Sequence, residues 1–461
     1  MSKMFTIKAS EAHGRRLDPE YHHALRRTRI RSTYPSAKLL SLSYFRTGGT
    51  PSTAHPEYWN GSIPWVSAKD FKAFRFEDSE DHVTELALAE STTCYVNRPA
   101  VLMVSRSGIL QHTLPVMVTH KPTTINQDIK AFFPDDRVSV DYIGAFFDVF
   151  GSRLLPLVCK SGATVQSLNT EQLMDLSIPL PPLPEQRKIV AELDAAYAAK
   201  RAADEKATKL LASIDDMVLN ELGIAKLPKP DTSLSSRIFT VSAREVHNGR
   251  LDSIAYQSMR RQFYKNVCAG MYEILRLNEI VDVDRRQTDS LGGLTYVGLE
   301  NINGEDGSYC PTSDKESIST AVLFRKDEIL FPKLRPYLNK VWLADFDGAA
   351  STEFFPLIPN GVSPEYLIAY LRLTQVAKVM TLLMTGNTLP RVQLEDVLSL
   401  PVPIPPRTVQ DRIASAASSI RAEARKLKAD ATAALDAAKR KIEAKIVDGG
   451  LSAVARFPKG C

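Results

Sequence analysis

The chain passes through the same proline-rich transition twice. Residues 176–186 read Leu-Ser-Ile-Pro-Leu-Pro-Pro-Leu-Pro-Glu-Gln, and residues 400–410 read Leu-Pro-Val-Pro-Ile-Pro-Pro-Arg-Thr-Val-Gln. A long polar, alanine-rich stretch follows each copy. Proline fixes φ and suits the first turn of a helix, so we expect residues 179–184 and 401–406 to be stiff connectors into long helices. The alternative, a PxxP docking peptide, is disfavoured because both copies occupy the same structural joint.

Apolar residues recur through both stretches in alternating steps of four and three, which favours a coiled coil. The first helix would lead from one globular domain to the next and the second would begin where that domain ends, so a pair of them must be antiparallel. At about 39 residues each would span ~58 Å. The walk selects Ile189, Leu193, Leu210, Ile214 and Met217 in the first helix and Ile413, Ile420 and Leu427 in the second, and continues through Ala434 and Lys441.

Further internal similarity predicts a duplicated architecture. Residues 5–18 and 239–252 are identical at eight of fourteen positions, 63–70 is echoed in 294–301, and the Gly-Ala-Thr at 162–164 matches Gly-Asn-Thr at 386–388. We therefore expect an α+β protein in which two related globular domains are separated by a two-helix antiparallel coiled coil. The expected boundaries are 1–177 for the first domain, 178–225 for its connector and helix, 226–400 for the second domain, 401–450 for the second connector and helix, and 451–461 for a tail.

Composition narrows the class of protein. The 461 residues are 44% hydrophobic and 24% charged, with a net charge of +5, which is ordinary for a globular chain. No apolar run is long enough for a bilayer span and the first residues lack a signal-peptide core, so we expect a cytoplasmic protein. The five cysteines form no CxxC pair, which argues against zinc or a disulfide framework. Residues 1–31 carry eight basic and three acidic side chains, either a polyanion-binding arm or simply a solvated one.

Within the first domain, short apolar runs predict strands at 65–67, 100–104 and 130–133, and 141–155 reads as a helix. The second domain repeats this order with strands at 296–299, 328–331 and 353–357 and a helix near 364–383. The aromatic residues of the first helix are expected in the core rather than on a base-stacking surface.

Catalytic signatures are missing from the sequence. It contains no GxxxxGK[ST] phosphate loop, GxGxxG turn, GxSxG elbow or HExxH helix, and no Asn-Pro-Pro-aromatic tetrapeptide. The eight histidines lack metal-ligand spacing, and His13 and His247 occupy equivalent repeat positions, which favours a structural role. We expect a chain without cofactor or metal that binds and positions while other subunits do chemistry.

Polar turns after the predicted strands are the expected recognition sites. Arginine reads guanine in the major groove, and Ser, Thr, Asn and Lys contact phosphates or base edges. Ordinary surface turns remain the alternative at each position. The candidate DNA-binding residues are Ser67, Lys69, Ser105, Arg106, Ser107, Lys160, Asn301, Lys333 and Arg335.

The sequence resembles the specificity subunits of Type I restriction-modification systems. The resemblance rests on Gly-Gly-Thr-Pro-Ser at 48–52, Tyr-Trp-Asn-Gly at 58–61, Ile-Pro-Trp-Val-Ser-Ala-Lys-Asp at 63–70, Gly-Ala-Thr-Val-Gln at 162–166 and the proline-rich run at 178–186, together with the duplicated layout. The second copy departs from the pattern, with Arg-Thr-Val-Gln at 407–410 in place of Leu-Pro-Glu-Gln.

That resemblance implies two target recognition domains that each read one half of an asymmetric, bipartite site in double-stranded DNA. The helices would set the spacer and dock two modification subunits, which would use S-adenosylmethionine to methylate adenine. Restriction subunits would use ATP and Mg to translocate and cleave DNA. Two alternatives stay open: a partner in which methyltransferase and nuclease are fused, and a duplicated protein-protein scaffold that has no sequence-specific DNA binding.

Overall fold

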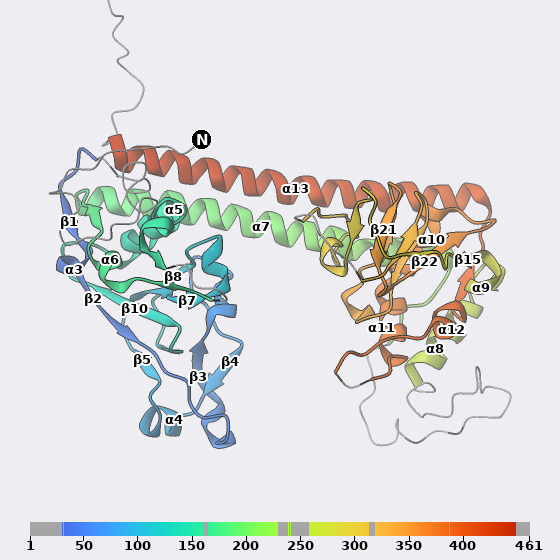
Figure 1. The fold of residues 1–461 in the computed structure, drawn as a ribbon, viewed down its shortest axis with the longest axis horizontal. Helices are drawn as coiled ribbons and strands as arrows, with labels where there is room; N and C mark the ends of the chain where they lie inside the picture. Colours follow the sequence, from blue (N-terminus) through green and yellow to red (C-terminus); the bar gives the residue numbers. More distant parts are fainter. Residues whose placement is uncertain are drawn as a thin grey trace, which may run out of the picture. The chain divides into compact units, whose positions relative to one another are not determined.

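The computed structural model describes residues 30, 32–160, 165–228, 238, 240, 258–312, 319–386 and 388–448. The repeat at 5–18 and 239–252, most of the basic segment 1–31, His13, His247 and the 162–164 motif lie outside these residues. Contacts divide the chain into unit 1, Met1–Ala202 with Asp430–Cys461, and unit 2, Ala203–Ala429. Figure 1 shows the elements of each unit. Among the described residues no helix is long and apolar enough to cross a membrane, and no three metal-binding side chains gather.

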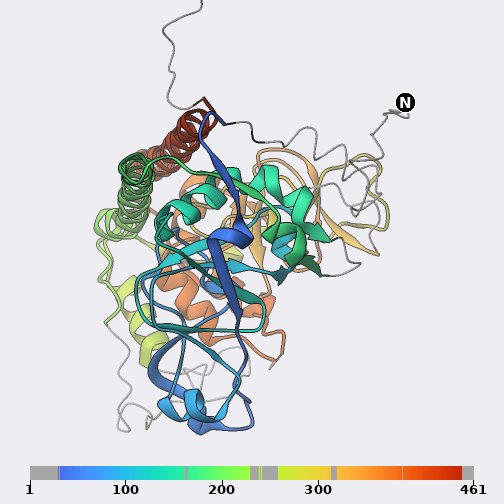
Figure 2. The same cartoon turned by 90° about the vertical axis from the view of Figure 1, so that its left-hand side faces the viewer.

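Unit 1 is built on two four-stranded sheets. One has the strand order β2-β10-β6-β8 and the other β4-β3-β9-β5. Helix α5 packs against β6 and β8 (Figures 1 and 2), and its aromatic side chains lie in the main core, as the sequence predicts. The elements before the long helix are β1 Ser36–Lys38, α3 Leu39–Leu42, β2 Ser43–Thr47, η1 Pro56–Tyr58, β3 Trp59–Val66, η2 Ala68–Asp70, β4 Asp81–Val83, α4 Glu85–Glu90, β5 Cys94–Val96, β6 Ala100–Val104, β7 Arg106–Ser107, η3 Gly108–Gln111, β8 Val116–Thr119, β9 Thr123–Ile125, β10 Ile129–Pro134, α5 Val140–Val158, β11 Cys159–Lys160, β12 Gln166–Leu168, α6 Thr170–Met174 and β13 Ser177–Pro179.

Unit 2 has a related but not identical order of elements. Its sheets run β15-β22-β19-β20 and β16-β18-β21-β17, and the parallel pair β17–β21 corresponds to β3–β9. The helix predicted near 364–383 is broken at Arg372 and Leu373 into two helices. The elements are α8 Ser258–Cys268, β14 Ile274–Arg276, α9 Leu277–Ile280, β15 Val281–Val283, β16 Gln287–Thr288, β17 Tyr296–Val297, η7 Leu299–Asn301, β18 Ala321–Phe324, β19 Ile329–Pro332, η8 Pro336–Leu338, β20 Trp342–Leu343, β21 Gly348–Ser351, β22 Phe354–Pro359, α10 Pro364–Leu371, α11 Thr374–Leu382, α12 Leu394–Leu398 and β23 Pro401–Pro403.

The two proline-rich transitions begin as strands. Strand β13 pairs with β1 and β23 pairs with β14, each in a two-stranded antiparallel sheet. Pro179 of the first expected connector and residues 401–403 of the second are therefore strand. A two-stranded sheet tolerates proline because each strand has one edge that needs no N–H donor.

A buried glutamine then fixes the entry into each long helix. The Gln186 side chain accepts from Ser139 N at 2.9 Å and donates to Pro181 O at 2.9 Å. Gln410 makes the same two bonds, with Ser363 N and Pro405 O, at the same lengths. The second copy, which has Arg-Thr-Val-Gln at 407–410 in place of Leu-Pro-Glu-Gln, therefore keeps the glutamine that makes these two hydrogen bonds.

The long helices are α7, Leu183–Leu222, and α13, Arg407–Asp448, and each unit contains a segment of both. In unit 1, Glu192 pairs with Lys445 and the Lys439 ammonium lies 5.2 Å from the Tyr197 ring centroid, so the two segments are antiparallel there. In unit 2, Glu221 pairs with Arg412, and side chains of both helices share one core.

The burial of these helices follows the predicted walk in part. Ile189, Leu193, Ile214 and Ile413 are buried, Met217 and Ile420 pack against the core, and Leu210 and Leu427 are half-buried. Towards the end of α13 the prediction fails by one position: Ala434 and Lys441 are exposed, whereas Leu435 and Ile442 are buried. A straight helix has 3.6 residues per turn, so a seven-residue walk drifts off the buried face.

Candidate nucleic-acid interface

A small three-stranded sheet in unit 1 brings two of the predicted cationic residues together. Its strand order is β11-β12-β7, and the register pairs Lys160 with Ser167 and Ser167 with Arg106. Residues directly opposite in antiparallel strands share a face, and neighbouring strands lie about 4.8 Å apart. Arg106 and Lys160, both exposed, therefore project from one face at a strand separation of ~10 Å. Such a face can contact phosphate and base edges together.

The two serines beside Arg106 have local structural roles. Ser105 is buried: its N–H donates to Asp128 O at 2.7 Å and its hydroxyl donates to the same oxygen at 3.0 Å. The Ser107 hydroxyl accepts from Ile109 N at 3.4 Å and caps η3. These bonds hold the strand-to-η3 turn that presents Arg106.

Unit 2 builds the equivalent turn with different side chains. Lys333 N donates to Glu353 O at 2.8 Å and Val392 N donates to Lys333 O at 3.0 Å, the bonds that Ser105 makes in unit 1 with Asp128 and Leu168. The bridge between Leu334 and Arg391 then corresponds to the pair Arg106 and Ser167. The arginine of unit 2 thus stands on the opposite strand from that of unit 1.

An acidic neighbour modifies this second arginine. Arg391 donates to both carboxylate oxygens of Glu353, with Nη2···Oε1 at 2.6 Å and Nε···Oε2 at 2.9 Å. These hydrogen bonds lower the pKa of Glu353 and raise that of Arg391. Lys333 is half-buried with its ammonium 4.6 Å from the Phe355 ring centroid, and burial lowers its pKa. In unit 2 the two cationic side chains at this turn therefore already have partners within the protein: Arg391 binds Glu353, and Lys333 lies over the Phe355 ring.

Arg335 occupies an unusual backbone conformation. Its φ is 50°, in the left-handed region, and it precedes Pro336, which further restricts the preceding residue. Its N–H donates to Pro390 O at 3.2 Å, and its side chain is exposed at the start of η8. Residues with strained backbone conformations cluster at binding sites, and Arg335 combines such a conformation with an exposed cationic side chain.

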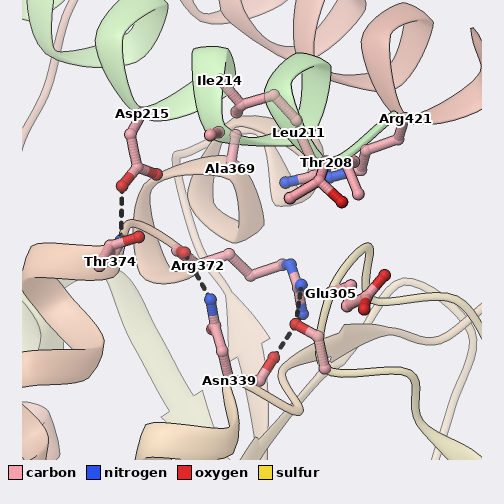
Figure 3. Close-up of a pocket in the computed structure, with 12 residues that line it drawn as sticks. Thr208, Leu211, Ile214, Asp215, Glu305, Asn339, Ala369, Arg372, Thr374 and Arg421 are labelled. Atoms are coloured by element: carbon pink, nitrogen blue, oxygen red, sulfur yellow. Dashed lines mark hydrogen bonds between the residues drawn. The ribbon is translucent and has the colours of Figure 1, made fainter. Parts of the chain in front are cut away.

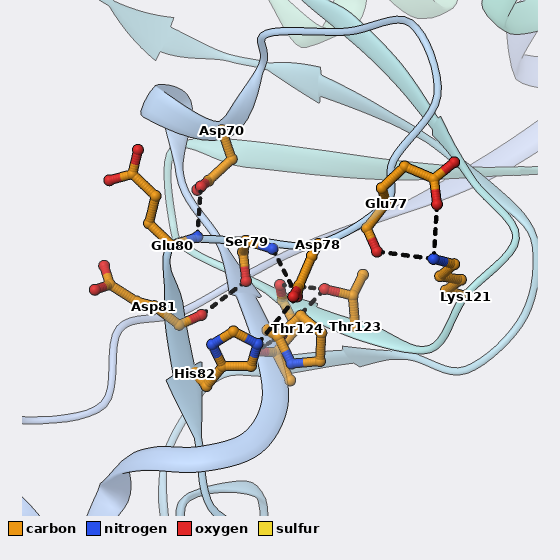
Figure 4. A network of polar contacts seen from close by, with 11 residues as sticks. Asp70, Glu77, Asp78, Ser79, Glu80, Asp81, His82, Lys121, Thr123 and Thr124 are labelled. Carbon is orange, nitrogen blue, oxygen red and sulfur yellow. Dashed lines mark hydrogen bonds and ion pairs between the residues drawn. The ribbon is translucent and has the colours of Figure 1, made fainter.

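The predicted residues after β3 and β17 lie in a different, more acidic setting. Ser67 N donates to Asp70 Oδ2 at 2.8 Å, and Lys69 pairs with Asp81 at 2.9 Å and Glu80 at 3.3 Å. The hydrogen bond to Asp81 is the main reason that the pKa of Lys69 is raised. Figure 4 shows the surrounding network, in which Lys121 also pairs with Glu77. A phosphate at Lys69 would have to displace these carboxylates.

Asn301 is the unit 2 counterpart of Asp70. It is only 2% exposed, accepts from Gly298 N at 2.8 Å and donates to Cys310 O at 3.1 Å and Thr312 Oγ1 at 3.0 Å. Its amide is thus fully occupied in holding the turn after β17. Contact of these predicted residues with DNA stays a prediction. The sequence analysis did not identify the strand that pairs with each turn, which carries Ser167 in unit 1 and Arg391 in unit 2, because strand register is not encoded in local spacing.

A cavity of about 300 Å³ lies within unit 2, between its segments of α7 and α13 and the globular part (Figure 3). Arg372 holds the surrounding loops together by donating hydrogen bonds to Asn339 O at 2.6 Å, Val341 O at 2.8 Å and Gly304 O at 2.9 Å. Burial lowers the pKa of Arg372 to about 9. Asp215 in the same wall accepts from Thr374 N at 3.0 Å. All of these hydrogen bonds involve backbone atoms, so they hold helices and loops together and do not indicate an active site.

Comparisons with known proteins agree with the resemblance seen in the sequence. Residues 35–209 match the family described as Type I restriction modification DNA specificity domain. The chain is 40% identical over 148 residues to the Type I restriction enzyme EcoR124I/EcoR124II specificity subunit of Escherichia coli, an alignment that covers 32% of this chain and 37% of that relative. It is 21% identical over 396 residues to the MjaIX specificity subunit of Methanocaldococcus jannaschii, covering 82% and 84% of the two chains.

Similar solved structures include a chain from a study of complex assembly and conformational transition of the type I R-M system, with TM-score 0.47, 14% identity and coverage of 91% of this chain and 98% of that one. A second is the S subunit of a Type I system from M. genitalium, with TM-score 0.40, 12% identity and coverage of 90% and 96%.

Proposed function

We propose that this chain, whose residues 35–209 match the family described as Type I restriction modification DNA specificity domain, reads a bipartite, asymmetric DNA site, one half with each unit, without performing catalysis itself. The observation that carries the proposal is the equivalent strand-turn-η element at Ser105–Gln111 and at 333–339. The backbone bonds match while the cations differ, so two related scaffolds present unlike reading surfaces. Unlike surfaces predict unlike half-sites.

The proposed partners follow from the same family. Two modification subunits would dock on the paired helices and methylate adenine with S-adenosylmethionine, and restriction subunits would supply ATP- and Mg-dependent cleavage. The helices α7 and α13 would set the spacer between half-sites. Deleting one heptad, residues 203–209, is expected to change the spacer or abolish activity while leaving both half-site sequences intact; an unchanged spacer at full activity would refute this role.

Modified-base sequencing of the native genome, with and without this gene, tests the function directly. Loss of adenine methylation at an interrupted two-part motif is the expected result and would reveal both half-sites. A protein-protein scaffold would instead leave methylation intact and show neither sequence-dependent DNA retention nor the steep fall of affinity with salt that phosphate contacts cause.

Arg106→Ala tests the interface in unit 1. If Arg106 makes a bidentate base contact, the substitution should cost roughly 1–3 kcal/mol and relax only one half-site. Measuring affinity against single-base variants of both half-sites checks this, and an effect spread equally over both would contradict the assignment.

A further inference from the structure

Exposed apolar side chains stand beside the proposed reading element in both units. In unit 1, Ile109 in η3 is 40% exposed and Val165, the residue before β12, is 41% exposed. In unit 2, Tyr337 in η8 is 48% exposed and Leu389 is 47% exposed. Single exposed apolar residues are common and need no explanation, but a repeated pair next to a binding element does.

The backbone shows that these pairs are equivalent. Ile109 and Tyr337 are each the second residue of the 3-10 helix that follows the capping residues Ser107 and Arg335. Gln166 lies opposite Ser107 in unit 1, and Pro390 O accepts from Arg335 N in unit 2, so Gln166 and Pro390 are equivalent. The residues that precede Gln166 and Pro390 therefore occupy the same position in the two units. They are Val165 in unit 1 and Leu389 in unit 2. The sequences differ, yet an exposed apolar side chain recurs at both places in both units.

The neighbours of the pairs favour nucleic acid as the occupant. Arg106 and Lys160 are exposed on the adjoining sheet of unit 1, and Arg335 is exposed beside Tyr337 in unit 2. Cations beside apolar atoms match a groove in which phosphates flank base edges. In the major groove the one apolar group that a base pair offers is the C5-methyl group of thymine.

We propose that Ile109 with Val165, and Tyr337 with Leu389, are specificity-determining pairs that each contact a thymine methyl group in the half-site read by their unit. This inference rests on the proposed DNA reading. It requires at least one A·T pair within each half-site and predicts that the methyl group, rather than the hydrogen-bonding edge of that base, is recognised.

The test combines DNA and protein changes. Once the motif is known, deoxyuridine replaces each thymine of one half-site in turn, which removes only the methyl group. The intact chain, with its partner subunits where they are needed for solubility, should bind about fourfold more weakly at one position, the equivalent of ~0.8 kcal/mol for one buried carbon. The variant Ile109→Thr/Val165→Thr should lose this sensitivity in one half-site and Tyr337→Thr/Leu389→Thr in the other.

Leu40→Thr is the matched control, because Leu40 is an exposed apolar residue of unit 1 in α3, a helix whose main contacts are with β1, β2 and α6. It should keep the full deoxyuridine effect. Half-sites without thymine, or a deoxyuridine effect that survives in the double variants, would overturn the inference. Variants that lose subunit assembly but keep the deoxyuridine effect would overturn it in favour of a protein contact. If the unaltered chain shows no sequence preference at all, the proposed function itself fails.

Discussion

At the scale of single residues, the most informative side chains are the two buried glutamines that close the proline-rich transitions. Gln186 and Gln410 are 0% and 4% exposed and each joins the N-terminus of a core helix to the entry of a long helix. The sequence predicted the joint but assigned it to proline stiffness. A side chain that satisfies one N–H and one C=O far apart in sequence cannot be recognised from local spacing.

Replacing Gln186 with leucine should destabilise unit 1 by about 2–4 kcal/mol, because Ser139 N and Pro181 O would each lose a partner in a buried place. Hydrogen exchange of the α5 amides in increasing urea measures this within the intact chain. Gln410→Leu should instead reduce the protection of the α10 amides. Gln111→Leu, at an exposed position, should leave the protection of both helices unchanged. Equal loss of protection in both units would contradict the local role of the bond.

The pair Glu353 and Arg391 predicts a pH dependence in unit 2. The pKa of Glu353 is lowered from its ordinary 4.5 by the hydrogen bonds from Arg391, so the stabilisation is complete above pH 4.5 and is lost as the pH falls through the lowered value. The Arg391 side chain is 40% exposed, which limits the contribution to about 0.5–1 kcal/mol. Denaturant midpoints of the protein and of Glu353→Gln should differ at neutral pH and converge in acid; a gap that widens in acid would reverse the sign.

At the scale of elements, sequence periodicity identified the longest helices and some of the core strands, but not the short elements or the pairing of strands. Helix α5 and strands β6 and β10 agree with the predicted ranges because their apolar patterns are long or continuous. The two-residue strand β7 and its partner β12 were out of reach, because their pairing spans about sixty residues of sequence. For that reason Ser105 reads as a surface residue although it is buried.

Asp148 on α5 is the residue through which three helices of unit 1 meet. It accepts from the Tyr197 hydroxyl at 2.9 and 3.0 Å and from Lys439 Nζ at 2.9 Å. Asp148→Ala should cost about 2–4 kcal/mol, since a phenol and an ammonium lose their acceptor in a largely buried place. Tyr197→Phe should cost only about 1 kcal/mol. Denaturation of both variants gives the comparison, and equal losses would show that the Lys439 contact contributes nothing.

At the scale of the whole molecule, unit 1 is completed by a segment from a distant part of the chain. Unit 1 takes Leu435, Ile442 and Ile446 of α13 into the same core as Ile189 and Leu193 of α7. The duplicated layout and the antiparallel helices were predictable because repeats and proline boundaries are local signals. The face of α13 that is buried in unit 1 could not be predicted, because the surface against which the helix packs decides which of its residues are buried.

Ending the chain after Ala429 should therefore unfold unit 1 while unit 2 stays folded. Removing Leu435, Ile442 and Ile446 alone forfeits about 5 kcal/mol or more, comparable with the total stability of a domain. Limited proteolysis with mass spectrometry would detect cleavage throughout 32–160, and a chain that ends after Asp448 keeps all these contacts as the control. Continued protection of unit 1 in the shorter chain would contradict the expectation.

The division of α13 between the units also bears on how the protein is made. Unit 2 is one continuous stretch, Ala203–Ala429, whereas unit 1 needs a segment that is translated after all of unit 2. Domains generally fold in the order in which they leave the ribosome. Here that order is inverted, because the unit whose strands emerge first is the last to acquire its full core. Until α13 has been translated, the nascent chain exposes the apolar surface of unit 1 that this helix covers in the folded protein.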